Sequence, residues 1–230
     1  EQLREVCLAQ PRRDAGGGQM FNDATHAAIE KWTQDLIARK KNNQPAVGLL
    51  SSGQALLVEE PGRWAKKFAD MEMPNYKDFP ILTGALATLF DHGIPVIYIT
   101  GDVHWGRIVE GTNYQGKKLF YEVIASPSRL IDTAIGDQKN TIKNAWNALL
   151  GDAKPFPKHP DAPCDLAGIK MGNLNLSTKH QQQGDHVALL RFHAIAGGLE
   201  FSVDYVCTDP DEKKRRKYSS PQGKFKLLGF

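Results

Sequence analysis

Residue types that bind metal ions stand close together in the segment Gly101-Asp102-Val103-His104. Asp102 offers a hard carboxylate oxygen and His104 an imidazole nitrogen, and their spacing lets both reach one metal ion from a tight loop. Arg107 adds a planar guanidinium that suits phosphate oxygens, and Trp105 lies between His104 and this arginine. These residues predict metal-assisted chemistry on a phosphate. The alternative is that Asp102 caps a turn and that His104 is a hydrogen-bonded histidine at the surface.

The element that precedes this loop is predicted to support it. Residues 94–100 are nearly continuously apolar, as is typical of a strand buried on both faces. Residues 81–92 carry apolar side chains on one stripe before Gly93, which predicts a helix. Short strands are also predicted at 46–50 and 119–125. This pattern indicates an α/β fold, in which ligands gather at the carboxyl ends of strands.

The rest of the chain divides into segments of different character. A helix is predicted to begin at Asn22 or Asp23, because either residue can cap it. Residues 186–193 and 199–206 predict a hairpin, in which His186 and His193 are interpreted as core or edge histidines. The predicted divisions are an irregular segment 1–21, a domain 22–208 that contains an insertion or long loops at 132–180, and a charged tail 209–230.

Composition excludes several classes of protein. The 230 residues are 41% hydrophobic and 24% charged, which fits a globular domain and excludes wholesale disorder. No apolar run approaches the ~18 residues that a transmembrane segment needs. The net charge of +3 is too small an excess to indicate a nucleic acid partner. A soluble protein is therefore expected, and an exported one if a leader precedes Glu1; the compartment itself stays unknown.

The order of several short motifs resembles the PhoD-like (alkaline phosphatase D) branch of the calcineurin-like metallophosphoesterases. In that branch a buried strand runs into Gly-Asp-Val-His, as in Ile99-Thr-Gly-Asp-Val-His104 here. The resemblance covers about residues 22–127. Its other motifs are the helix that bears Trp32 with the segment Ser51-Ser-Gly-Gln54, the stretch from Asp70 to Pro80, and the turn from Glu122 to Pro127.

This resemblance implies a layered β-sandwich flanked by helices and the hydrolysis of phosphate mono- or diesters by a metal-activated water. It implies Asp102 and His104 as metal ligands, with His104 also catalytic. Two metal ions are implied, either iron with calcium or another divalent pair. We expect Arg107 and Trp105 to border the phosphate of the ester substrate.

One part of the family pattern is missing from the sequence. The chain contains no Gly-Asp-x-x-Asp, the motif whose carboxylate bridges the two metal ions. We therefore expect this chain to be the C-terminal half of the enzyme, completed by an N-terminal half in the same gene product or in a separate chain. Two alternatives stay open: a non-catalytic binding or interaction protein with a degenerate phosphoesterase fold, and a polyanion-binding module that uses Lys213–Lys217.

Overall fold

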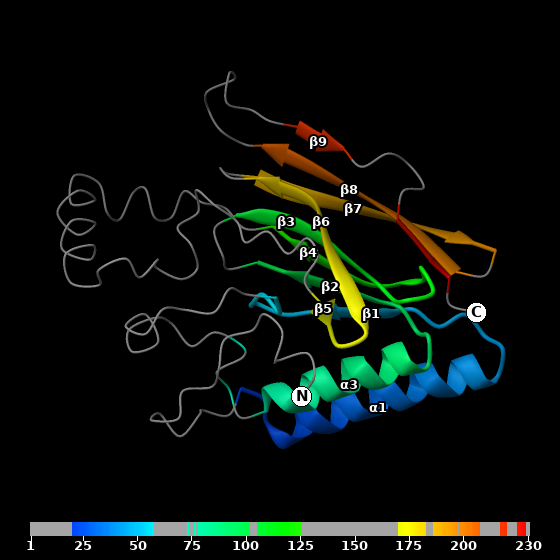
Figure 1. The fold of residues 1–230 in the computed structure, drawn as a ribbon. Helices are drawn as coiled ribbons and strands as arrows, with labels where there is room; N and C mark the ends of the chain where they lie inside the picture. The colour runs from blue at the N-terminus through cyan, green and yellow to red at the C-terminus, as the bar shows by residue number, and fades with distance from the viewer. Residues whose placement is uncertain are drawn as a thin grey trace, which may run out of the picture.

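The computed structural model describes residues 20–57, 73, 76, 78–101, 105–125, 170–182, 186–196, 198–207, 217–219 and 225–228. These residues form two helices and ten strands (Figure 1). In chain order they are α1 (Asp23–Lys41), β1 (Gly48–Ser51), α3 (Phe79–Asp91), β2 (Val96–Thr100), β3 (Gly106–Thr112), β4 (Lys118–Ile124), β5 (Lys170–Met171), β6 (Leu174–Gln182), β7 (His186–Ile195), β8 (Gly198–Cys207), β9 (Lys217–Ser219) and β10 (Phe225–Leu228).

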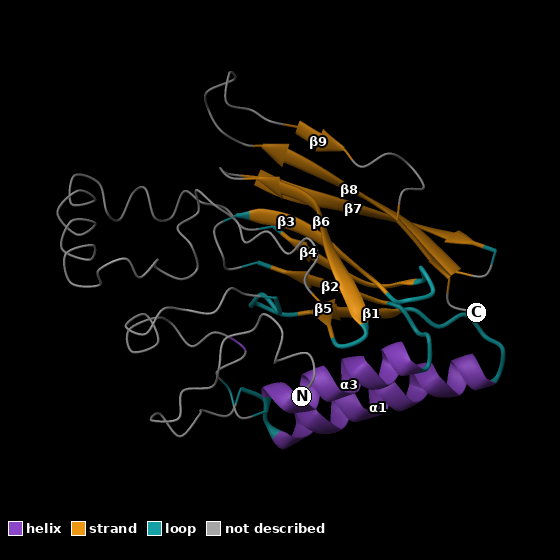
Figure 2. Ribbon diagram, viewed as in Figure 1, coloured by secondary structure: helices purple, strands orange, loops and turns teal. Residues whose placement is uncertain are grey.

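The described strands form two sheets. The first has the order β1-β2-β4-β3-β6-β5, in which β1, β2 and β4 run parallel and the other neighbours pair antiparallel. The second is antiparallel, with the order β10-β8-β7 and with β9 also paired to β8. Both helices lie on one side of the first sheet and the second sheet lies on the other (Figure 2). The predicted α/β class is confirmed, and the two packed sheets agree with the predicted sandwich.

Alternation along the central strands builds a separate apolar core on each face of the first sheet. In β2, Val96 and Tyr98 belong to the core that also contains Leu82 and Leu86 of α3. Ile97 belongs to the other core, which lies against the second sheet. Successive side chains of a strand point to opposite faces, so a strand covered on both sides must be apolar at every position. This is the reason why the run at 94–100 is continuous.

Local signals fix where the two helices begin and end. The Asn22 side chain accepts a hydrogen bond from the backbone N–H of Thr25 at 2.8 Å, which caps α1 as predicted. At the end of α3, Gly93 takes a φ of 66°, a conformation that glycine adopts at little cost. Neither of the two helices in the described part of the chain is long and apolar enough to cross a membrane.

Residues 132–180 were predicted to be an insertion or long loops, and the structure differs from this prediction at the C-terminal end of the segment. Within that segment, β5 and most of β6 form two strands of the first sheet. The sequence pattern concealed β6, because polar residues at 177–181 occupy both of its faces beyond Leu176. The predicted charged tail likewise contains β9 and β10, and Phe225 of β10 is a core residue. The rest of the tail and of 132–180 lies outside the described residues.

The Asp78 carboxylate joins the start of α1 to the start of α3. It accepts hydrogen bonds from the backbone N–H groups of Met20 at 3.0 Å and Phe21 at 2.6 Å, and it pairs with His26 at 3.2 Å. Burial raises the pKa of this carboxyl group, but these hydrogen bonds outweigh burial, so that the pKa of Asp78 in the folded protein lies below its ordinary value.

Replacing Asp78 should therefore destabilise the protein in a pH-dependent manner. We expect Asp78→Ala to lower the free energy of unfolding by about 1.5–3 kcal/mol at pH 7, the usual contribution of hydrogen bonds to a charged group. A lowered folded pKa gives stability that is present above the unfolded pKa of about 4 and is lost as the pH falls through the folded value. The difference between wild type and variant, measured by urea unfolding, should thus shrink from pH 7 to pH 3.

The matched control for this prediction is Asp35→Ala. Asp35 is exposed and pairs along α1 with Lys31, at 2.6 Å, and such surface pairs contribute about 0.3–0.5 kcal/mol. An Asp78→Ala effect that is no larger than the Asp35→Ala effect, or that stays constant with pH, would contradict the role given to the carboxylate.

Candidate functional site at the carboxyl ends of the parallel strands

The predicted metal ligands Asp102 and His104 lie outside the described residues, but the residues on both sides of them in the chain are described. β2 ends at Thr100, and the neighbouring parallel strands end at the same edge. Ser52, after β1, donates to the Ile99 carbonyl at 3.1 Å, and Ala125, after β4, donates to the Thr100 carbonyl at 3.0 Å. The Gly-Asp-Val-His segment therefore begins at the carboxyl edge of three parallel strands, where the sequence predicted it.

Arg107 lies in β3, fully buried, and its guanidinium is bound within the protein. Its Nη2 donates to Glu122 Oε2 at 2.6 Å and to the Leu57 carbonyl at 2.5 Å. Glu122 in β4 is also fully buried, and its Oε1 accepts from the backbone N–H groups of Leu56 and Leu57 at 2.9 and 3.0 Å. The ion pair thus ties residues 56–57 to two strands of the first sheet.

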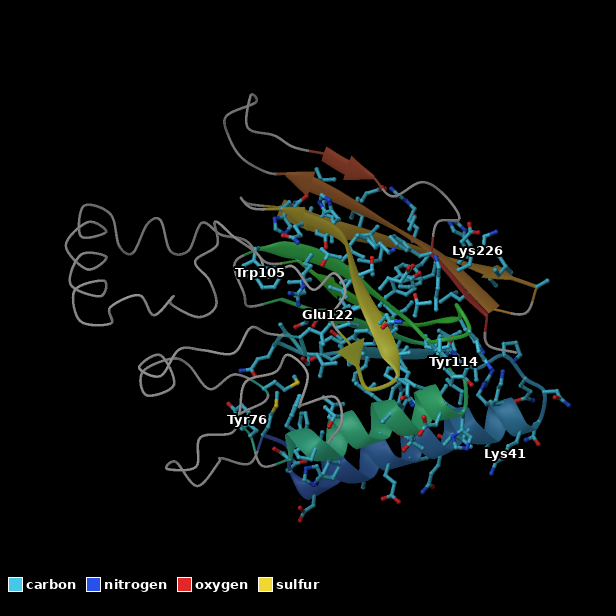
Figure 3. All side chains as sticks on the ribbon, viewed as in Figure 1. Lys41, Tyr76, Trp105, Tyr114, Glu122 and Lys226 are labelled. Carbon is cyan, nitrogen blue, oxygen red and sulfur yellow. The ribbon has the colours of Figure 1, made fainter. Side chains whose placement is uncertain are left out.

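Trp105 lies directly beside this ion pair. The Cζ atom of Arg107 stands 4.7 Å from the centroid of the Trp105 ring, within the range of a cation–π contact. Trp105 lies at one end of the first sheet and Tyr114 at the other, with Glu122 between them (Figure 3). The indole is buried, and its Nε1 has no hydrogen-bond partner in the described structure. A buried donor without an acceptor suits a site that a water or ligand oxygen completes.

These positions bear on the expectation that Arg107 and Trp105 border a substrate phosphate. The sequence placed Arg107 in a loop, whereas the structure places it inside a strand and gives its charge an internal carboxylate. Arg107 therefore has a structural role that the sequence did not indicate. Its contact with a phosphate, like that of Trp105, stays a prediction.

The segment after β1 is held to the same edge by a second anchor. The Tyr98 hydroxyl donates to the Gln54 carbonyl at 2.7 Å and also contacts the Ser52 hydroxyl. Burial raises the pKa of Tyr98 far above its usual value, so this phenol stays protonated and available as a donor. With Glu122 binding residues 56–57, the whole stretch 52–57 is fixed beside the ends of the parallel strands.

On the opposite face of the first sheet, aromatic and polar side chains pack over Gly106. A Cβ atom at Gly106 would lie 2.7 Å from His186 Nε2 and 3.0 Å from both Gln182 Cγ and Tyr205 Cε1. Only glycine leaves room for this contact. Tyr205 donates to the Ile124 carbonyl at 2.6 Å and lies 3.2 Å from the Arg107 carbonyl oxygen. His186 is thereby packed onto Gly106, the first residue of β3, which follows His104 by two positions in the chain.

His180 and Gln182 complete this cluster. His180 Nε2 is 2.9 Å from Gln182 Oε1, and its ring centroid is 5.2 Å from that of Tyr205. Burial lowers the pKa of His180, and the bond to Gln182 offsets this only in part, so the imidazole is neutral at neutral pH. Sequence reasoning did not connect these residues with the site. They carry little signal in the sequence, because each lies at or near the end of a strand and only the fold brings that end to this edge.

The predicted histidine roles agree with the structure, while the predicted metal site is not completed by it. His186 is buried, and His193 is exposed on the edge strand β7. Among the residues that the structure describes, no three His, Cys, Asp or Glu side chains form a group that could hold a metal ion. Asp102 and His104 themselves lie outside these residues, so the predicted site stays a prediction.

No protein-family model matches this chain, no curated protein matches its sequence, and no solved structure matches it.

Proposed function

We propose that this chain is part of a metal-dependent phosphoesterase that hydrolyses phosphate mono- or diesters, and that it contributes the segment Gly101-Asp102-Val103-His104. The observation that supports the proposal most directly is the position of this segment. It follows β2, which lies between the parallel strands β1 and β4 and is covered on both faces. A segment that directly follows such a strand is attached to a rigid part of the fold, as a catalytic loop requires.

The layered arrangement supports a calcineurin-like architecture as part of this proposal. One helical layer, a mixed sheet and a second antiparallel sheet follow one another (Figure 2). In the sequence, the candidate segment directly follows strand β2 of the mixed sheet. Asp102 and His104 are the proposed ligands, through a carboxylate oxygen and an imidazole nitrogen. When bound, a metal pair supplies an activated water and neutralises phosphate charge. Trp105 Nε1 is the described side-chain donor nearest in sequence to these ligands and is proposed to bind a substrate oxygen.

The second candidate is a non-catalytic binding protein that keeps the same fold. It is favoured by the absence from this sequence of Gly-Asp-x-x-Asp, the family motif whose carboxylate bridges the two metal ions. The enzyme proposal requires the missing ligands to come from a proposed N-terminal half. The third candidate, polyanion binding through Lys213–Lys217, concerns side chains outside the described part of the chain.

The metal content of this chain purified together with the proposed N-terminal half distinguishes the first two candidates. For the enzyme we expect about two metal ions per chain by elemental mass spectrometry. We also expect hydrolysis of bis-p-nitrophenyl phosphate that EDTA abolishes and added divalent metal restores. Measurable hydrolysis that EDTA leaves unchanged would contradict the metal mechanism. Absence of both metal and hydrolysis would favour the binding protein.

A further inference from the structure

The second sheet ends in the long strand β7, whose outer edge pairs with no other described strand. Within the described residues β7 bonds only to β8, and the ten pairs from His186–Cys207 to Ile195–Gly198 follow one another without a bulge. At about 3.3 Å per residue, β7 is roughly 33 Å long. Proteins usually protect such edges with proline, lysine, an inward charge or a bulge. β7 contains no proline, lysine, aspartate or glutamate.

Apolar side chains gather on this strand. Of the six large hydrophobic residues that are exposed in the described part of the chain, three belong to β7: Val187 (49% exposed), Leu189 (47%) and Phe192 (41%). Ala188 and Leu190 face the core between the sheets, so alternation places Val187 and Leu189 on the outer face. An exposed apolar strand whose outer edge meets no other described strand is typical of a surface that pairs with another strand.

Charge indicates what kind of strand fits this edge. Arg191 is the one permanently charged residue of β7, and Asp204 of β8 already pairs with it on the same face. A partner strand therefore needs no opposite charge and should itself be apolar and nearly neutral. β7 has this character, which makes the edge self-complementary.

We propose that the protein forms a two-fold dimer through antiparallel pairing of β7 with β7 of a second copy. A two-fold axis at Leu189 places this residue opposite Leu189 of the partner subunit and Ala188 opposite Leu190 of the partner subunit. It also keeps the outer faces of both copies on one side. An axis at Arg191 would bring two like charges directly opposite each other, which is unfavourable. The dimer joins the two second sheets into one continuous sheet.

Sedimentation velocity over a range of protein concentrations tests this dimer with a matched pair of variants. Leu189→Lys places like charges across the proposed axis and should weaken the dimer at least tenfold. Ile81→Lys is the control, since Ile81 on α3 is exposed to a similar extent (44%) but lies far from β7 in the fold. Ile81→Lys should dimerise as the wild type does.

A cross-link tests the register independently of any change in stability. In a background with Cys7, Cys164 and Cys207 replaced by serine, Leu189→Cys should form a disulfide-linked dimer under mild oxidation, whereas Ile81→Cys should not. A wild-type monomer at the highest concentration reached would overturn the proposal. So would equal dissociation of the two lysine variants, or a monomer whose outward β7 amides are protected from hydrogen exchange by another segment. None of these outcomes depends on the phosphoesterase proposal.

Discussion

Glu122→Gln should lower the free energy of unfolding by about 3–5 kcal/mol, the usual cost of removing one partner of a buried ion pair. The variant leaves the Arg107 guanidinium buried without a counter-charge, 2.6 Å from an amide in place of the carboxylate. The substituted side chain keeps an oxygen that can still accept from the Leu56 and Leu57 amides. The loss therefore reports the charge pair rather than the loop contacts. Chemical denaturation at pH 7 measures it.

A double-mutant cycle separates the ion pair from its surroundings. Arg107→Met combined with Glu122→Gln removes both charges, and the double variant should be more stable than the sum of the two single losses indicates. Glu200→Gln provides the matched control, because Glu200 is 3.7 Å from the exposed Lys226 and such a pair contributes at most about 1 kcal/mol. If the losses at Glu122 and Glu200 are equal, the charge pair of Arg107 and Glu122 does not contribute as a buried ion pair should.

This result also changes how an Arg107 variant is interpreted. Loss of activity in Arg107→Ala could follow from release of residues 56–57 as well as from loss of a phosphate contact. Glu122→Gln leaves Arg107 in place and so provides the comparison. If Arg107 contacts phosphate, its removal should raise the KM of the ester more than Glu122→Gln does at equal folded fraction.

His104→Ala should lower phosphate-ester hydrolysis by about a thousandfold and reduce the metal content per chain. A catalytic metal contributes several kcal/mol to transition-state stabilisation, and about 1.4 kcal/mol corresponds to a tenfold change in rate. The imidazole of His104 is one of the two proposed ligands in this chain, so its loss should leave Asp102 unable to hold the ion alone. Initial rates with bis-p-nitrophenyl phosphate and elemental mass spectrometry measure both effects.

The control for this variant is His193→Ala. His193 is exposed on β7, seven residues along that strand from His186, and it has no assigned role in the site. Its replacement should leave metal content and rate unchanged. If His104→Ala keeps full metal content and activity, Gly101-Asp102-Val103-His104 is not the metal segment, and the phosphoesterase proposal fails with it.

Several elements could be predicted from sequence because their causes are local. The cap of α1 depends on Asn22 and an amide three residues later, and the end of α3 depends on Gly93. The predicted hairpin differs from β7 and β8 by at most two residues at its ends, since apolar and polar residues alternate along its second arm from Leu199 to Tyr205. β2 was predicted because a strand covered on both faces carries an unbroken apolar run.

The α/β class, the helix caps and the place of Gly101-Asp102-Val103-His104 after a buried strand follow from local patterns of residues. The ion pair of Arg107 with Glu122, the packing of His186 over Gly106 and the place of β6 in the first sheet depend on tertiary contacts. These contacts join residues 15, 80 and about 70 positions apart in the chain. Neither residue of such a pair carries a local pattern that identifies its partner, because the contact exists only once the sheet has brought the two strands together.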